Sequence, residues 1–580
     1  MAFGQVTQRR SVGTTGVQGN DDAACISMTP DARYVAFTSG SSNLVPGDSN
    51  NLWDVFLRDR RLGTTERVSV TSTGLEGDGA SYDGWLSADG RFVSFTSLAG
   101  NMVPNDSNAT YDAFVRDRHS GLTERISVGP NGVEGNADSY AAPISADGRY
   151  VLFSSFASNL VAGGASGQQV YVRDRLSGVT EIISVDSQGN QGNGFSFAAS
   201  ISADGRHVAF ASEASNLVPG DGNGNPDVFV RDRMAGTTER VSVDSNGVEA
   251  AYTSEPDAQI SADGRYVVFV TDAPNLVVGD TNQKADVFIH DRRAGTTERV
   301  SVDSSGVQCD GDCYYPRVSA DGRFIVFSSW AGNLVSGDSN NMLDVFVRDR
   351  QSGSTERASI GAGGVEGDNG SASGQEPSAD GRYVAFSSFA TNLVPDDLNA
   401  RDDVFLRDRY DGTTFTDLCS PGIDGVASCP CGNPPSTAGR GCENSSGTGG
   451  AVLSASGGAF LSSDSLVFVT RGETPTGLSM LTQWTGVNAS GVTFGMGVRC
   501  TSGTFRRLYA KQAVAGSMTA PSFGMGDQQV SVRSASLGDV IVAGQSRWYL
   551  VYYRDSMVLG GCPPTSTFNA TQTGRIAWWP

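Results

Sequence analysis

The chain has 580 residues, more than one ordinary domain accommodates, and 38% of them are hydrophobic, so at least two packed domains are expected. No apolar run approaches the roughly 20 residues that a membrane-spanning helix needs. The net charge of −21 makes nucleic acid an unfavourable partner. From Cys419 onward ten basic residues face seven acidic ones, so residues 419–580 carry +3 and residues 1–418 carry −24.

A nine-residue phrase of the form SADGRYVAF recurs along the first part of the chain. A spacing this regular is typical of a repeat architecture. Each repeat holds four β-rich pieces, which around Asp263 read SEPDAQIS, RYVVFV, ADVFIHD and TTERVSV. Successive repeats are 58, 58, 57, 59, 58 and 59 residues apart, counted at the turn aspartates Asp31, Asp89, Asp147, Asp204, Asp263, Asp321 and Asp380.

Four antiparallel strands per repeat and the absence of a helical period predict an all-β fold, a seven-bladed β-propeller over residues 1–418. ADGR is expected to turn between the first and second strands, and DRRAGTT between the third and fourth. The ring is expected to close through an outer strand. QVTQRRSV at 5–12 resembles an outer strand such as TTERVSV, so the N-terminal strand is expected to close the ring, although TTFTDL at 413–418 also fits that place. The Arg-Asp-Arg and Thr-Glu-Arg repeats indicate cross-strand ion pairs.

The part that follows holds six of the nine cysteines. We expect a Cys-rich linker at 419–445 and, over 446–580, a small antiparallel β-sandwich stapled by about three disulfides. The paired spacing of Cys309 and Cys313 and the cluster CPCGN at 429–433 indicate disulfides, and therefore an extracellular or cell-envelope location. The opening MAFGQVTQ lacks the apolar core of a signal peptide, so a mature secreted protein is expected.

SADGRYVAF followed by DVFVRDR resembles the repeat of TolB-like, WD40-like propellers, called the PD40 repeat. This resemblance covers residues 1–418 and implies a bacterial envelope or secreted protein, commonly one that binds protein or glycan. The segment CPCGNPPSTAGRGCENSSGTGGA, with the end GRIAWWP, resembles a C-terminal module of secreted proteins from planctomycetes and myxobacteria.

Candidates for catalysis are few. The three histidines, His119, His207 and His290, each vary a position that other repeats fill differently, which favours structural roles. HExxH, Gly-x-Ser-x-Gly and Walker motifs are absent, which argues against a Ser–His–Asp site or a His-ligated zinc. A pair of carboxylates for glycoside hydrolysis stays open, because acidic residues are abundant.

The loop between the second and third strands carries the most regular polar motif, Asp-x-Asn-x3-Asp, which only the third repeat (AGGASGQQ at 162–169) lacks. Oxygen donors at alternating loop positions are the ligands of Ca²⁺, so calcium is the cofactor predicted, and no organic cofactor is expected. The alternative is turn chemistry, in which Asp and Asn cap the backbone. The candidate ligands are Asp48, Asn50, Asp54, Asp106, Asn108, Asp112, Asp221, Asn223, Asp227, Asp280, Asn282, Asp286, Asp338, Asn340, Asp344, Asp397, Asn399 and Asp403.

Aromatic residues that depart from the repeat mark a candidate ligand surface, because aromatics beside polar loops suit stacking on sugars; packing within the blades is the alternative. In a four-stranded blade the second-to-third loops and the blade-to-blade connections lie on one face, which is expected to be strongly acidic. An enzyme should gather such departures at one end of the channel, and a scaffold should spread them around the ring. The candidates are Trp53, Tyr82, Trp85, Tyr111, Tyr314 and Tyr315.

The function predicted from these features is a secreted or surface-retained propeller that binds a glycan or a protein. The alternatives are a polysaccharide-active hydrolase or lyase that uses carboxylates on the acidic face, and a structural envelope protein. The oligomeric state is not predicted.

Overall fold

The computed structural model describes residues 6–409 and, with gaps at 410–415, 420, 423–425, 438, 457–458, 460–463, 465, 543–544 and 556–566, residues 416–578. The chain divides into two compact units, one of residues Val6–Arg409 and one that begins at Tyr410. The boundary therefore lies before the predicted residue 418. Within the described ranges, no helix is long and apolar enough to cross a membrane.

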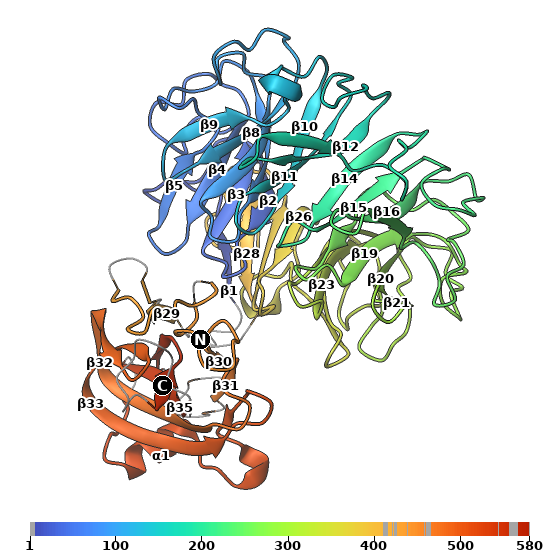
Figure 1. Ribbon diagram of the computed structural model, residues 1–580. Helices are drawn as coiled ribbons and strands as arrows, with labels where there is room; N and C mark the ends of the chain where they lie inside the picture. The colour runs from blue at the N-terminus through green and yellow to red at the C-terminus, as the bar shows by residue number, and fades with distance from the viewer. Residues whose placement is uncertain are drawn as a thin grey trace. The chain divides into compact units, whose positions relative to one another are not determined.

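The first unit is a seven-bladed β-propeller in which each blade is a four-stranded antiparallel sheet (Figure 1). The first strands of the blades are neighbours around the ring and surround its axis. They are β2 (Ala23–Met28), β6 (Ser81–Leu86), β10 (Ser139–Ile144), β14 (Ser196–Ile201), β18 (Gln259–Ile260), β22 (Cys313–Val318) and β26 (Ser371–Pro377). We number the blades 1 to 7 in this order.

The second and third strands of each blade are the most deeply buried. The second strands are β3 (Tyr34–Ser39), β7 (Phe92–Ser97), β11 (Tyr150–Ser155), β15 (His207–Ser212), β19 (Tyr266–Thr271), β23 (Phe324–Ser329) and β27 (Tyr383–Ser388). The third strands are β4 (Asp54–Asp59), β8 (Asp112–Asp117), β12 (Gln169–Asp174), β16 (Asp227–Asp232), β20 (Asp286–Asp291), β24 (Asp344–Asp349) and β28 (Asp403–Asp408).

The outer strands are short, and five of the seven carry the Thr-Glu-Arg phrase. They are β5 (Thr64–Arg67), β9 (Leu122–Arg125), β13 (Val179–Ile182), β17 (Thr237–Arg240), β21 (Thr296–Arg299), β25 (Ser354–Arg357) and, for blade 7, β1 (Val6–Arg9). Apolar residues fill the space between blades rather than a single centre. In one such cluster, Val55 and Leu57 of blade 1 pack with Phe95 and Phe114 of blade 2. Two 3₁₀ turns, η1 (Pro130–Gly132) and η2 (Ala362–Gly364), lie between blades.

The N-terminal strand closes the ring. β1 pairs antiparallel with β28, with Val6 opposite Asp408. Its Arg9 contacts Asp397 at 3.1 Å and Asp403 at 3.3 Å, as the arginine of Thr-Glu-Arg does in other blades. The competing segment ends in β29 (Thr416–Cys419), which pairs with β37 (Thr573–Ala577) of the second unit. It has no arginine at this place, so it lacks the residue that the blade 7 carboxylates require.

Two features of each ADGR turn require its glycine, a left-handed backbone and a close contact with an aromatic ring. Gly90 has φ +68°, and a Cβ there would lie 2.4 Å from the Tyr34 ring of the preceding blade. Arg118, from the turn after β8, lies over the same Tyr34 ring at 4.6 Å and pairs with Glu66 of blade 1 at 2.5 Å. An aromatic ring, a glycine and an arginine therefore lock the blades together at the ADGR turns, whereas blade 1 has Ala32, with φ +56°, at the glycine position.

The second unit is an antiparallel β-sandwich. Its larger sheet joins β29, β32 (Leu478–Phe494), β33 (Gly497–Gln512), β35 (Ser546–Arg554), β36 (Phe568–Ala570) and β37 (Thr573–Ala577). The smaller sheet joins β30 (Val452–Ser456), β31 (Val467–Arg471) and β34 (Thr519–Ala520). Residues of both sheets, among them Phe468 and Tyr549, share one core, which α1 (Val530–Ser536) also enters; η3 (Phe523–Met525) precedes it.

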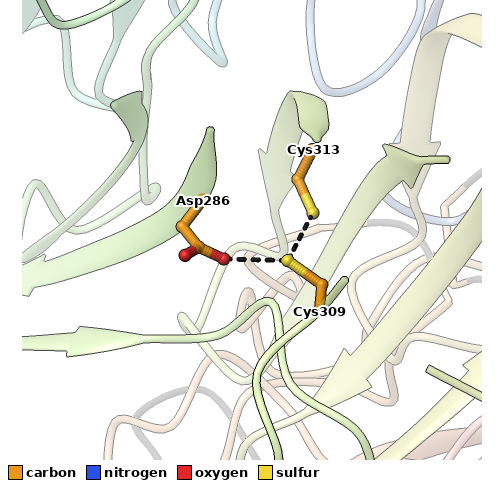
Figure 2. A group of neighbouring side chains, drawn as sticks. All are labelled: Asp286, Cys309 and Cys313. Atoms are coloured by element: carbon orange, nitrogen blue, oxygen red, sulfur yellow. Dashed lines mark hydrogen bonds between the residues drawn. The ribbon is translucent and has the colours of Figure 1, made fainter. Parts of the chain in front are cut away.

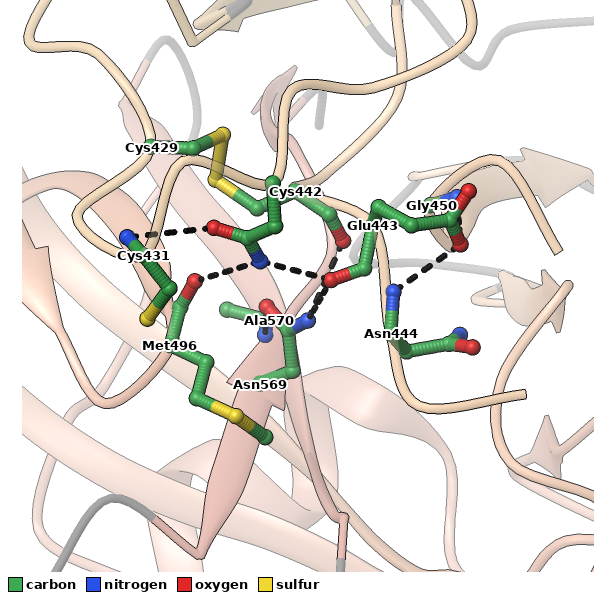
Figure 3. Close-up of a disulfide and its surroundings, with 10 residues drawn as sticks. Cys429, Cys431, Cys442, Glu443, Asn444, Gly450, Met496, Asn569 and Ala570 are labelled. Atoms are coloured by element: carbon green, nitrogen blue, oxygen red, sulfur yellow. Dashed lines mark hydrogen bonds between the residues drawn. A yellow bond between two sulfur atoms is a disulfide. The ribbon is translucent and has the colours of Figure 1, made fainter. Parts of the chain in front are cut away.

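A disulfide between Cys429 and Cys442 staples the Cys-rich segment, with S–S 2.01 Å (Figure 3). Cys431 and Cys500 are disulfide-bonded as well. Asn433 connects this segment to the sheet, because its side-chain amide donates to the carbonyls of Glu443 and Met496 at 2.7 and 3.2 Å. Disulfides in this unit were predicted from the sequence and are confirmed, whereas Cys562 lies outside the described residues.

The inter-blade lock can be tested with two glycines of the same backbone conformation. Gly205 has φ +71° and a Cβ there would meet Tyr150 at 2.2 Å, whereas Gly220 has φ +79° and open space around it. Gly220→Ala should lower the free energy of unfolding by about 1–2 kcal/mol, because alanine disfavours the left-handed conformation. Gly205→Ala should cost about 1–3 kcal/mol more through the steric clash, measured as free energy of unfolding in urea. Equal losses in the two variants would show that the ring contact contributes nothing.

Candidate functional site

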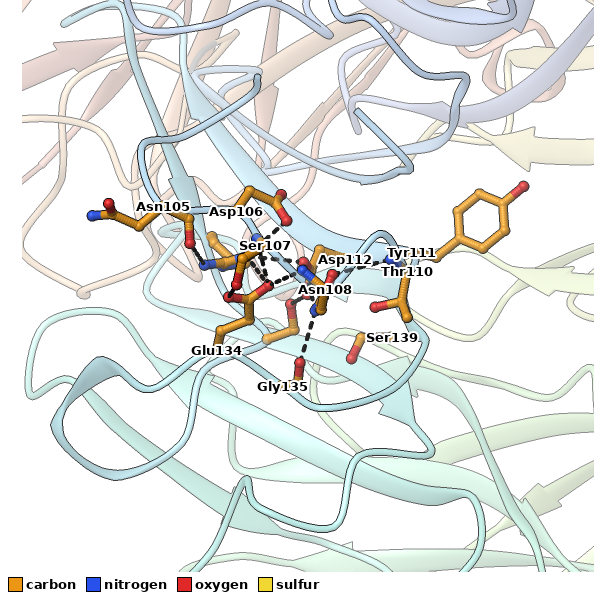
Figure 4. A network of polar contacts seen from close by, with 12 residues as sticks. Asn105, Asp106, Ser107, Asn108, Thr110, Tyr111, Asp112, Glu134, Gly135 and Ser139 are labelled. Carbon is orange, nitrogen blue, oxygen red and sulfur yellow. Dashed lines mark hydrogen bonds and ion pairs between the residues drawn. The ribbon is translucent and has the colours of Figure 1, made fainter. Parts of the chain in front are cut away.

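An arginine occupies the centre of the Asp-x-Asn-x3-Asp loops. In blade 2, Arg125 contacts Asp106 at 3.3 Å, Asp112 at 3.0 Å and Glu134 at 3.3 Å (Figure 4). Asn108 donates to the Gly135 carbonyl at 2.8 Å and accepts from the Thr110 amide at 3.0 Å. The loop is thus held by turn chemistry and by one guanidinium. Since Asn108 bonds to the connection that follows blade 2, the two loop sets share one face, as predicted.

An arginine between two aspartates recurs in six blades; a glutamate joins them in four, and Gln308 and Gln18 stand at its place in blades 5 and 7. In each set, the aspartate that begins the third strand, here called the inner aspartate, accepts a hydrogen bond from a buried serine that follows the outer strand. Ser69, for example, donates to Asp54 at 2.6 Å. Burial raises the pKa of Asp48, Asp106 and Asp338 to about 6, against the attraction of their arginines, which lowers it. The six arginines, in blade order with blade 7 last, are Arg67, Arg125, Arg240, Arg299, Arg357 and Arg9.

Blade 3 lacks the whole set at once. Gln169 replaces the inner aspartate, Ile182 replaces the arginine and Gln191 replaces the glutamate. Gln169 still accepts from Ser184 at 2.6 Å, so the buried hydrogen bond survives without charge. Blade 3 has lost the arginine and the carboxylates together, which indicates that in the other blades these groups balance each other's charge. Calcium at these loops stays a prediction, and an ion there would have to share or displace the guanidinium.

Four aromatic rings form a continuous row on this face across blades 1 to 3. The ring centroids of Trp53 and Tyr82 are 6.2 Å apart, those of Tyr82 and Tyr111 6.3 Å, and those of Tyr111 and Tyr140 5.9 Å. Tyr82 and Tyr140 are each 36% exposed. The four lie exactly one half-repeat apart, at intervals of 29 residues. We call Trp53, Tyr82, Tyr111 and Tyr140 the aromatic row.

Three of these four residues were predicted from the sequence. Tyr140 was missed, although its 29-residue spacing from Tyr111 was readable. Trp85 is a partly buried residue of β6 and has no ring contact among the described residues; its indole nitrogen is buried without a partner there. The structure therefore places Trp85 beside the row rather than in it.

Tyr314 and Tyr315 contact each other on blade 6, with centroids 6.1 Å apart, and do not join the row. Tyr315 is 44% exposed and has φ +53°; Asp83, next to Tyr82, has φ +64°. A left-handed conformation in a non-glycine residue costs free energy and is commonly retained at functional positions. Asp83 accepts from Thr96 at 2.6 Å, and burial raises its pKa to about 6.

A second acidic group lies where blade 7 meets blade 1. The Asp402 amide donates to Asp22 Oδ1 at 3.0 Å, and Asp402 Oδ1 is buried without a partner among the described residues. Burial, and then the charges of Asp22 and Asp403, raise the pKa of Asp402 to about 8. Asp402 occupies the place that Trp53 and Tyr111 hold in blades 1 and 2.

The histidines have the structural roles predicted for them. His207 takes the aromatic place of the inter-blade lock, against the turn of Gly264, and burial lowers its pKa. His290 replaces the third-strand arginine and contacts Thr297 Oγ1 at 2.8 Å. His119 lies in the turn after β8, where its amide donates to Asp117 at 2.9 Å.

The expected disulfide between Cys309 and Cys313 is not formed. Both residues are buried thiols whose sulfurs are 3.4 Å apart, well beyond a bond of about 2.05 Å. Each sulfur contacts an oxygen instead, Cys309 that of Asp286 at 2.9 Å and Cys313 that of Ser329 at 3.3 Å. The Cys313 thiol and burial raise the pKa of the Cys309 thiol.

No family model and no curated protein matches the sequence. Three solved structures are similar in fold. A TolB protein of Agrobacterium tumefaciens has 14% identity and TM-score 0.33 over 60% of this chain and 95% of its own. Oligogalacturonate lyase of Vibrio parahaemolyticus has 12% identity and TM-score 0.42, over 70% of this chain and 97% of its own. The β-propeller domain of the Trilobed protease of Pyrococcus furiosus has 11% identity and TM-score 0.40, over 63% of this chain and 91% of its own.

The likeness to these structures concerns the fold alone. The resemblance to PD40 repeats and to a C-terminal module of secreted bacterial proteins stays a prediction.

The role of the central arginines can be tested with calcium. We expect a chelator to leave the melting temperature of the wild-type protein unchanged, because Arg240 already pairs with Asp227 and Glu249 at 3.1 and 2.7 Å. Arg240→Ala should cost about 3–5 kcal/mol, since it leaves buried carboxylates unpaired. Added Ca²⁺ should then stabilise the variant. Loss of wild-type stability on chelation would instead assign calcium to the loops.

The Asp402 carboxyl predicts a pH dependence. A folded-state pKa of about 8, against an ordinary 3.8, means that its contribution to stability is complete below pH 4 and is lost as pH rises to 8. Asp402→Asn should therefore stabilise the protein at pH 8.5, by on the order of 1–3 kcal/mol, and change little at pH 4. Chemical unfolding at both pH values checks this, with Asp78→Asn, an exposed carboxylate, as the control. An equal gain in the free energy of unfolding of Asp402→Asn at both pH values would contradict this pH dependence.

Proposed function

We propose that the protein is a secreted or cell-surface binding propeller whose aromatic row receives a polysaccharide chain. The observation that carries the proposal is the row itself. Trp53 and Tyr111 are departures from the repeat, so blade architecture does not require them, whereas the place of Tyr82 and Tyr140 is aromatic in blades 4 and 6 as well. In the place of Trp53 and Tyr111, the later blades have Gln168, Pro226, Ala285, Leu343 and Asp402.

The geometry suits sugar rings. Aromatic faces offer large apolar area at low cost in side-chain entropy, and sugars present apolar faces of similar size. The rings follow one another at about 6 Å, so neighbouring sugars of one chain could each contact a ring. Carboxylates flank the row and can accept from hydroxyl groups. Asp138 already accepts from the Tyr111 amide at 3.0 Å, and Asp83 follows Tyr82 directly.

The location is supported by the Cys429–Cys442 disulfide, since such bonds persist mainly in oxidising compartments. A polysaccharide-active enzyme would use the same face. Asp83, whose raised pKa keeps part of it protonated near neutral pH, is the residue on which that alternative would depend.

Binding can be measured by retention of the purified chain on a panel of insoluble polysaccharides and by affinity electrophoresis on soluble ones, with calcium or with chelator. Tyr82→Ala and Tyr111→Ala should each weaken binding of the retained glycan by about 10-fold or more, as expected for loss of one stacking contact of 1–3 kcal/mol. Tyr252→Ala removes a 52% exposed ring outside the row and should leave binding unchanged.

Three results would contradict the proposal. Equal loss in Tyr252→Ala would show that the row is not the site. Retention on no glycan would favour a protein partner or a structural role. Release of soluble fragments that stops in Asp83→Asn would replace binding by catalysis.

A further inference from the structure

We propose that Asp286, Cys309 and Cys313 form a binding site for one thiophilic divalent cation of the zinc class. The site lies between blades 5 and 6, apart from the aromatic row, and does not depend on the proposed function. Asp286 begins β20, Cys309 lies in the connection between the two blades, and Cys313 begins β22 (Figure 2).

Both cysteines are departures from the repeat. At the position of Cys309 the other blades have glycine or alanine, as at Gly77 and Ala250, and at that of Cys313 they have serine or alanine, as at Ser81. Blade 5 also has Gln308 where blade 2 has Glu134. Two sulfurs have therefore been added at one place, next to an arginine with one carboxylate fewer.

The three donor atoms converge. Asp286 Oδ1 lies 2.9 Å from Cys309 Sγ, which lies 3.4 Å from Cys313 Sγ. All three ligand atoms lie within 4.8 Å of one another, so one ion can reach them together. Zinc bonds of about 2.3 Å to sulfur and 2.1 Å to oxygen place such ligands roughly 3.4–3.8 Å apart, so the atoms need to separate by only about half an ångström.

A fourth donor and an outer shell are present. Ser329 Oγ lies 3.3 Å from Cys313 Sγ and can complete four-coordination. Asp286 Oδ1 accepts from Ser301, and Oδ2 accepts from Asn282 at 3.0 Å. These bonds fix the carboxylate as outer-shell partners fix metal ligands elsewhere.

The charges also balance. Binding of one divalent ion forms two metal–sulfur bonds, and the two thiol protons leave to solvent. The net charge of the buried group is therefore unchanged, and Arg299, 3.3 Å from Asp286, keeps the partners it has now. Thiolates select zinc-class ions over calcium, which prefers oxygen. Because Asp286, Cys309 and Cys313 are each 0% exposed, the site would be closed and structural rather than catalytic.

The test uses the full chain, purified in chelator and then given Co²⁺ or Zn²⁺. We expect one equivalent of metal by elemental analysis and, with Co²⁺, the near-ultraviolet band of thiolate-to-cobalt charge transfer. Zn²⁺ should raise the melting temperature. Since two protons are released, the apparent affinity should fall about 100-fold for each pH unit below neutral.

The matched variants use residues that the repeat itself supplies. The double variant Cys309→Ala, Cys313→Ser restores the residue types of Ala250 and Ser81, so it should fold and lose the cobalt band, the metal and the zinc-dependent melting shift. Cys25→Ala changes a buried cysteine of blade 1 to the residue found at the matching position Ala141. This variant should keep the cobalt band, the bound metal and the zinc-dependent melting shift.

Two outcomes overturn the site. If both thiols react with an alkylating agent after unfolding, yet no metal is taken up at neutral pH, the donors only pack. If intact mass shows two hydrogens fewer than the thiol form expected here, and alkylation of Cys309 and Cys313 requires a reductant, the pair is a disulfide and holds no ion.

Discussion

Six of the seven blades contact the preceding blade in the same way, through an aromatic ring packed against the glycine of an ADGR turn. In blade 1 the glycine position is taken by Ala32, with φ +56°. Tyr34 occupies the space that a Cβ of Gly90 would need, and Arg118 lies over the same ring. His207 shows that the place requires a flat ring rather than a particular chemistry. The phrase SADGRYVAF therefore recurs in the sequence because it contains both the turn and the ring of this contact.

Polar residues inside the propeller follow a second rule, that a buried guanidinium is accompanied by buried carboxylates. Arg125 lies among three carboxylates, whereas Gln169, Ile182 and Gln191 form a neutral group at the same place in blade 3. A guanidinium presents several donors in one plane, which suits converging carboxylates. With these groups paired, residues that break the pattern are left to contact something else. Two rings of the aromatic row and the two sulfurs beside Asp286 are such departures.

Much of the fold could be predicted, because a period repeated seven times multiplies weak strand signals. Closure by the N-terminal strand was predicted, and β1 does pair with β28; the segment of β29 has a similar pattern, and Arg9 distinguishes the two. The domain boundary was placed at residue 418, whereas the first unit ends at Arg409. The Asp-x-Asn-x3-Asp motif identified the right loops, but a carboxylate pattern alone does not say whether an arginine from a distant strand lies among them. Cys309 and Cys313 lie next to each other, but the disulfide predicted for them is not formed. The contact of Cys309 with Asp286 joins residues 23 positions apart and has no local signal.

Closure by the N-terminal strand has a consequence for biosynthesis. Val6 pairs with Asp408, so β1 is synthesised before nearly the whole of the propeller that separates it from its partner strand. During that time blade 7 does not exist and β1 is an unpaired edge, the kind of segment that pairs with other chains. The short length of β1 and its arginine limit that hazard. The last step of assembly therefore joins the two ends of the nascent propeller, and a chain cut short at either end would leave an open ring rather than a smaller one.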